Sequence, residues 1–163
     1  EKIAISSAAI ANPRILTEIA NAIGRQSVVA VLDVRKKTGL LAKGYEICTH
    51  NGKKIHKIEP VALAKTLQDA GAGEIILNSV DLDGGMRGYD IALAQQLHWT
   101  LRVPMTVLGG AGSLDDISVL VHTCGVVGAA VGSLFVFKGK YRAVLINYPT
   151  TAQKEEIFRA ALT

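Results

Sequence analysis

The chain has 163 residues, of which 49% are hydrophobic, 20% are charged and 5% are aromatic. A chain of this length forms a domain with a sizeable core, and its aliphatic composition is typical of α/β proteins and excludes a disordered chain. The formal net charge of +4 is small and its bases are scattered, so it does not indicate a nucleic-acid partner, whereas an anionic small substrate is compatible with it. We therefore expect a single domain over residues 1–163.

Strand and helix signals alternate along the first half of the chain. Asn12 as N-cap and Pro13 at the first helical position begin a helix, and Gly24 ends it. Asn51-Gly52 is the strongest short signal for a hairpin turn. In chain order we expect a strand over 2–6, a small-residue loop over 7–11, a helix up to 23, a strand over 28–33, hairpin strands over 45–50 and 53–58, and a helix over 60–70.

The second half repeats this alternation. Capping-box spacing marks two helix starts, at Ser113 with Asp116 and at Thr150 with Gln153. We expect strands over 75–80, 105–108 and 126–131, helices over 88–101, 113–123 and 151–162, and a short helix from 132–133. Strands that alternate with helices form right-handed parallel βαβ units. Five such strands with four long crossover helices make about half of a (β/α)8 barrel, so the predicted fold class is α/β.

Composition and motifs exclude several other classes. Cys48 and Cys124 have no CxxC partner and are interpreted as buried thiols in a reducing cytosol. No secretory leader is visible and no apolar run reaches the ~18 residues of a membrane span, so we expect a cytoplasmic protein without membrane contact. The histidines share no ligand spacing and no dinucleotide fingerprint follows the first strand, so neither a metal nor another cofactor is predicted.

Two aspartates stand where parallel α/β folds place their chemistry. Asp33 ends the apolar run 28–33, and Asp83 follows the run 75–80 directly before Gly84-Gly85. A carboxylate at the carboxyl end of a buried parallel strand is suited to general acid–base catalysis. The alternative for each is an ordinary solvated loop or turn aspartate. Two such acids on neighbouring strands favour the catalytic interpretation.

Glycines follow two further strands. Gly109-Gly110-Ala111-Gly112 precedes one predicted helix, and Gly132-Ser133 precedes another. Helix N-termini carry partial positive charge and unpaired N–H donors, which are the groups that phosphate requires. Each loop alone is compatible with a plain tight turn. Two consecutive strand ends of this kind are typical of the phosphate site after strands seven and eight of a barrel.

Several stretches resemble, in the family's order, the cyclase subunit of imidazole glycerol phosphate synthase. They are EKIAISSAAIANP, VVAVLDV, NGKK, GAGEIILNSVDLDGGMRGYD, LGGAGS and AAVGSLF, which together span residues 1–137. The resemblance implies a (β/α)8 barrel, of which this chain supplies the C-terminal half, strands 4–8. It also implies an enzyme that uses ammonia from a glutaminase subunit to cleave and cyclise a bisphosphorylated ribulosyl-aminoimidazole carboxamide in histidine biosynthesis.

The same resemblance assigns roles to individual residues. It makes Asp33 the catalytic aspartate of the fifth barrel strand and Asp83 the acid on the sixth. It places Lys2 and Glu74 at the charged gate of the family's ammonia passage. The residues that it assigns to one phosphate site are Gly84, Gly109, Gly110, Gly132 and Ser133, and those near the other are Ser6 and Ser7.

The chain also departs from the family's pattern. The first three strands, with the aspartate that partners Asp33, have no counterpart in it. Ser6-Ser7 stand where the family usually has Asn-Thr, and Leu108 replaces the serine before the glycine pair. The tail over 140–149 resembles paralogues that supply ammonia for surface-polysaccharide sugars.

Three functions therefore stay open. The first is an ammonia-using cyclase or lyase of the histidine type. The second is an ammonia-channelling subunit for sugar amidation. The third is a non-catalytic half-barrel that associates with itself. In each case we expect either a homodimer or completion by an N-terminal half-barrel, because open parallel sheets leave edges and a face uncovered.

Overall fold

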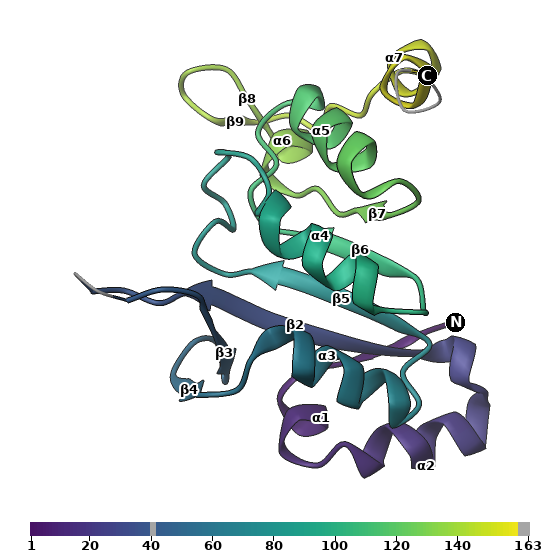
Figure 1. Ribbon diagram of the computed structural model, residues 1–163. Helices are drawn as coiled ribbons and strands as arrows, with labels where there is room; N and C mark the ends of the chain where they lie inside the picture. The colour runs from purple at the N-terminus through teal and green to yellow at the C-terminus, as the bar shows by residue number, and fades with distance from the viewer. Residues whose placement is uncertain (40–41, 160–163) are drawn as a thin grey trace.

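A computed structural model describes residues 1–39 and 42–159. Its main sheet has seven strands in the order β4-β3-β2-β5-β6-β7, and β1 pairs with the amino-terminal part of β2, on the edge that β3 occupies further along (Figure 1). The strands are β1 Ile3–Ile5, β2 Val28–Lys36, β3 Tyr45–Thr49, β4 Lys54–His56, β5 Glu74–Ser79, β6 Met105–Leu108 and β7 Gly128–Ala129. β1, β2, β5, β6 and β7 run parallel. The predicted α/β class, with five parallel strands as in half of a (β/α)8 barrel, is confirmed.

The helices are α1 Ser7–Ala11, α2 Arg14–Ile23, α3 Pro60–Asp69, α4 Ile91–Thr100, α5 Leu114–Cys124, α6 Ser133–Val136 and α7 Thr151–Arg159. α3, α4 and α5 connect successive strands and pack against one face of the sheet, whereas α7 follows the last strand and packs on α5 (Figure 1). The strand side chains that face them form the core, and each is at most 4% exposed: Val28, Ala30, Leu32, Ile75, Leu77, Met105 and Val107. Burial of these aliphatic side chains drives the helices onto the sheet. In the described part of the chain, no helix is long and apolar enough to cross a membrane.

Local signals mark most helix starts correctly. α2 begins at Arg14 with Pro13 as its N-cap, one residue later than expected, and the Asn12 side chain still accepts a hydrogen bond from the backbone N–H of Arg14 at 3.2 Å. Ser113 and Asp116 form the predicted capping box. Thr150 and Gln153 exchange the predicted hydrogen bonds before α7, although the expected helix residues 160–162 lie outside the described residues.

Two helix expectations are wrong. The segment 7–11 is the helix α1 and not a loop, because Ala9 and Ile10 are buried and docking them against the core stabilises a turn that small residues alone do not hold. The helix expected from residue 88 begins only at Ile91, since the Asp90 side chain caps it by accepting a hydrogen bond from the N–H of Leu93.

The strand bounds also differ at the carboxyl ends. β2 continues three residues beyond Asp33, because β3 pairs with it antiparallel from Asp33 opposite Cys48 to Lys36 opposite Tyr45. The Asn51-Gly52 hairpin between β3 and β4 is confirmed, with φ of 56° and 79° at the two residues. The strand expected over 126–131 is only Gly128–Ala129.

A second hairpin was not expected from the sequence. It consists of β8 Phe137–Lys138 and β9 Ala143–Val144 and forms a separate two-stranded sheet.

The two free cysteines, Cys48 and Cys124, are buried as predicted, and burial raises the pKa of both thiols.

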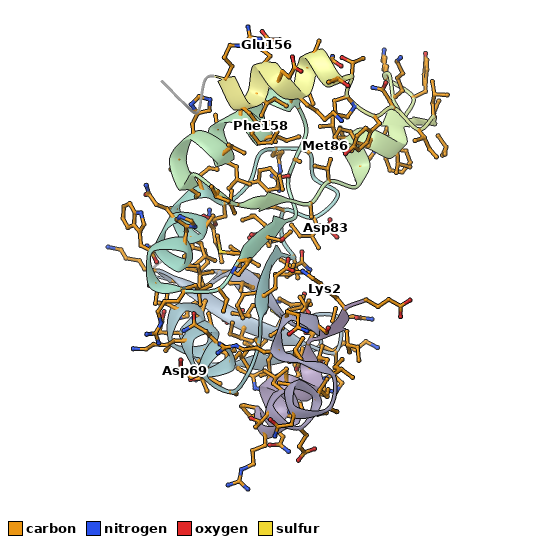
Figure 2. The ribbon with its side chains drawn as sticks, turned by 90° about the vertical axis from the view of Figure 1, so that its right-hand side faces the viewer. Lys2, Asp69, Asp83, Met86, Glu156 and Phe158 are labelled. Atoms are coloured by element: carbon orange, nitrogen blue, oxygen red, sulfur yellow. The ribbon has the colours of Figure 1, made fainter. Side chains whose placement is uncertain are left out.

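The sheet has a second face, turned away from the core helices, that we call the open face. The register pairs Asp33 with Asn78 and Asn78 with Leu108. Because alternate residues of a strand point to opposite faces, these side chains share one face. Its other members include Ala4, Val31, Ile76 and Thr106, and all seven are half-buried or exposed. Figure 2 looks along the strands from their amino ends and shows Lys2 and Asp83 on this side of the sheet.

Candidate functional site

The Asp33 carboxylate lies on the open face between two polar side chains from neighbouring strands. The Ser6 hydroxyl, directly after β1, donates to Asp33 Oδ2 at 3.0 Å. The Asn78 amide, in β5, donates to Asp33 Oδ1 at 2.8 Å. Three adjacent parallel strands therefore bring together one carboxylate, one hydroxyl and one amide. We call this group the Asp33 cluster.

The geometry of the Asp33 cluster leaves the carboxylate able to accept a proton. Each carboxylate oxygen has two lone-pair sites, and the contacts with Ser6 and Asn78 use one on each. The two donors fix the orientation of the carboxylate, while Asp33 is only half-buried. A substrate group on the open face can therefore approach it, which is the geometry that a general base requires.

Asn78 belongs to the Asp33 cluster but was not among the residues predicted from the sequence. Asparagine is uncommon inside an apolar strand. In β5, Ile75 and Leu77 point into the core, and Asn78 points to the opposite, open face. That anomaly is the signal that would have found it. Its Oδ1 atom is buried without a hydrogen-bond partner, and a Cβ on Gly109 would lie 3.3 Å from this atom. A glycine at 109 thus permits close approach of the loop after β6.

Asp83 lies apart from the strand ends. It is exposed in the turn that follows β5, and its backbone N–H donates to the carbonyl of Ser79 at 3.0 Å. Asp33 is a strand residue and Asp83 a turn residue, so the two predicted acids occupy different environments.

The predicted phosphate residues of the later loops pack against the segment 84–88. A Cβ on Gly84 would lie 4.0 Å from the Ser133 hydroxyl oxygen, so these two residues are neighbours. The Gly110 carbonyl accepts a hydrogen bond from Gly88 N–H at 2.8 Å. Gly109 and Gly110 have φ of 91° and 114°, which glycine adopts far more readily than other residues.

The start of α5 contributes less to this region than the sequence implied. The Asp116 carboxylate accepts the backbone N–H groups of Gly112 and Ser113, each at 2.9 Å. These donors are therefore occupied, and a negative charge stands at the helix N-terminus. A phosphate at this end of the sheet would depend on the segments of Gly84, Gly109, Gly110 and Ser133.

We expect Gly110→Ala to lower the free energy of unfolding by about 2–4 kcal/mol, because alanine is strained at this φ and its Cβ would overlap the carbonyl of Gly88. Urea unfolding measures this loss. Gly132→Ala is the matched control, since a Cβ on Gly132 meets no atom within 4 Å, and its effect should stay within about 0.5 kcal/mol. Equal stability of the two variants would contradict the tight packing of the Gly110 loop.

Ser6 and Ser7, the residues predicted near the second phosphate, make hydrogen bonds to different parts of the structure. Ser6 contacts Asp33, whereas the Ser7 hydroxyl accepts the backbone N–H of His50 at 3.1 Å. Ser7 therefore ties the start of α1 to the β3–β4 hairpin. In the same hairpin, the buried Thr49 hydroxyl lies 2.9 Å from His56 Nε2.

Lys2 and Glu74 form an ion pair at the opposite end of the open face. Lys2 Nζ lies 2.5 Å from Glu74 Oε2, and the Thr106 hydroxyl donates to Glu74 Oε1 at 2.7 Å. Burial acts to raise the pKa of Glu74, but the hydrogen bonds from Lys2 and Thr106 and the charge of Lys2 outweigh it, so the pKa is lowered. The predicted gate residues are thus in contact. Their role in ammonia passage stays a prediction.

Among the described residues, no group of three or more His, Cys, Asp or Glu side chains is arranged to hold a metal ion. The chemistry available on the open face is that of a carboxylate, an amide, a hydroxyl and a distant ion pair.

Comparison with known proteins identifies the family. The family model described as histidine biosynthesis protein matches residues 1–142. The chain belongs to this family. The chain is similar to a putative imidazole glycerol phosphate synthase subunit hisF3 of Vibrio vulnificus, 48% identical over 156 residues, which cover 96% of this chain and 59% of that protein. A putative subunit HisF of Leptospira interrogans is 49% identical over 158 residues, which cover 97% of this chain and 61% of that protein.

Proteins of lower identity are named imidazole glycerol phosphate synthase subunit HisF without the word putative. The imidazole glycerol phosphate synthase subunit HisF of Chlorobium phaeobacteroides is 36% identical over 117 residues, or 72% of this chain and 45% of that protein. The resemblance to a subunit of imidazole glycerol phosphate synthase is therefore confirmed. The chain spans about 60% of the length of the Vibrio and Leptospira relatives named above.

Proposed function

We propose that the chain provides a catalytic carboxylate and a phosphate site to a cyclase of the imidazole glycerol phosphate synthase type. The observation that carries this proposal is the Asp33 cluster, in which Ser6 and Asn78 hold both carboxylate oxygens at the carboxyl ends of parallel strands. Parallel barrels place catalytic groups at that end. Asp33 accepts a proton from a substrate group on the open face and returns it as the ring forms.

The proposal extends to the substrate and the nitrogen source. The substrate is a phosphorylated sugar derivative with one phosphate over Gly84 and Ser133, two residues that lie side by side. Ammonia comes from a glutaminase subunit at the amino ends of the strands and passes the Lys2–Glu74 pair, which lies at that end. Free thiols fit the reducing cytoplasm in which such biosynthesis takes place.

A second candidate is the ammonia-channelling subunit for sugar amidation. Leu108 favours it, because this side chain extends from β6 onto the open face beside Asn78. An apolar side chain there offers no hydrogen bond to a substrate next to the Asp33 cluster. The ammonia-handling part is common to both candidates, and the two differ in what the open face binds.

We expect inorganic phosphate to shift the backbone amide resonances of Gly84, Gly109, Gly110, Gly132 and Ser133 before others. The loops that bear these residues meet at one end of the sheet and supply backbone donors. An amide-resolved NMR titration of the purified chain measures this. Shifts confined to the two lysines of the β3–β4 hairpin, Lys53 and Lys54, would place the anion there and remove the phosphate part of the proposal.

A further inference from the structure

The β8–β9 hairpin brings an arginine to the loop that follows β5. Arg142 Nη2 donates to the Gly84 carbonyl at 3.4 Å, although the two residues are 58 positions apart. The guanidinium carbon lies 4.8 Å from the centre of the ring of Phe137 in β8, so a cation–π contact supports it. Figure 1 shows this hairpin beyond the carboxyl ends of the strands.

The backbone of the hairpin turn holds Arg142 in this place. Arg142 has a φ of 49°, and its N–H donates to the Gly139 carbonyl at 3.0 Å. Positive φ is uncommon for arginine. The turn therefore aims the side chain back toward Gly84 instead of leaving it to extend freely.

This end of the sheet needs a cation if it is to hold a phosphate. The Asp116 carboxylate occupies the N–H groups at the start of α5 and lies 3.3 Å from where a Cβ on Gly88 would stand. Asp83 adds an exposed carboxylate beside Gly84. A phosphate dianion between these acids is repelled unless a positive charge offsets them.

Arg142 meets this requirement. A guanidinium has five N–H donors, and the bond to Gly84 uses one of them. Its planar donors match two oxygens of one phosphate. Gly84 is also the neighbour of the Ser133 hydroxyl, so the guanidinium and this hydroxyl flank the same residue. A second guanidinium, that of Arg87, lies close by, with Nε 3.4 Å from where a Cβ on Gly85 would stand.

We propose that Arg142 is a phosphate-binding residue that joins the β8–β9 hairpin to the site at Gly84 and Ser133 and selects a phosphomonoester over an uncharged substrate. This inference rests on the phosphate site of the proposed function. It adds a residue that lies outside the sequence motifs over 1–137, at the last position that the family model matches. It also gives the hairpin a role as one wall of the binding site.

The test is an NMR titration of the purified chain with inorganic phosphate at fixed low ionic strength, followed at the Gly84 and Ser133 amides. Arg142→Gln should raise the dissociation constant roughly tenfold, as expected for loss of a charge-assisted hydrogen bond. Arg142→Lys keeps the charge without the planar donors and should fall between this variant and the unaltered chain. Lys140→Gln is the matched control, because it removes one charge from an exposed position of the same hairpin, and it should change the constant less than about twofold.

The outcomes separate this inference from the function on which it rests. If phosphate shifts Gly84 and Ser133 equally well in Arg142→Gln, the role of Arg142 is overturned and the phosphate site stands. If Lys140→Gln weakens binding as much as Arg142→Gln does, general attraction by the hairpin replaces a specific contact, and the proposal again fails. If phosphate does not shift these amides in the unaltered chain, the phosphate site itself fails. Amide spectra of each variant without phosphate verify that it is folded.

Discussion

Asp33→Asn lowers turnover by about 10²- to 10⁴-fold in the catalytically competent protein, while substrate affinity changes less than about tenfold. The amide that replaces the carboxylate cannot accept a proton, which removes general acid–base catalysis. The variant keeps the fold, because its Oδ1 still accepts from Asn78 and the Ser6 hydroxyl can turn to accept a hydrogen bond. Steady-state kinetics that separate kcat from KM measure the effect.

The control for this variant is Asp69→Asn. Asp69 is the last residue of α3 and pairs loosely with Arg102 at 3.7 Å, and Figure 2 shows it far from Asp83. It carries the same change of charge without the Asp33 cluster, so turnover should stay within about twofold. An unchanged rate in Asp33→Asn would return Asp33 to the role of an ordinary half-buried aspartate.

The polypeptide of residues 1–163, taken alone, should associate into a dimer. Val31, Ile76 and Leu108 place apolar side chains on the open face, where they are only partly buried. β1 and β7 each pair with a single strand and so form the two edges of the parallel array. Parallel sheets are normally buried on both faces, and a second copy related by two-fold symmetry is the simplest cover.

Light scattering across the micromolar range measures this association. Ile76→Glu places a charge in the middle of the open face and should shift the protein toward monomer, because burial of an unpaired carboxylate is costly. Trp99→Glu is the control, since Trp99 is 73% exposed on α4, outside the open face. A stable, folded monomer of the unaltered polypeptide would contradict the expected dimer and show that the open face tolerates water.

The local signals of this sequence determined the class of fold and the positions of several turns and helix starts. The Ser113–Asp116 capping box and the Asn51-Gly52 turn hold in the structure, because each depends on hydrogen bonds or backbone preferences within a few residues. The alternation of strands and helices predicted the parallel arrangement of the strands, because strands joined by helical crossovers form right-handed parallel βαβ units. The motifs over 1–137 pointed to the family that the comparisons confirm.

Tertiary structure alone decided the extent of several elements and the members of the site. α1 exists because Ala9 and Ile10 dock on the core, and β2 extends past Asp33 because β3 pairs with it. Asn78 belongs to the Asp33 cluster through strand register, a relation between residues 45 positions apart. Arg142 reaches Gly84 through a hairpin of two-residue strands. These contacts join distant parts of the chain, and their free energy depends on partners that local sequence patterns do not contain.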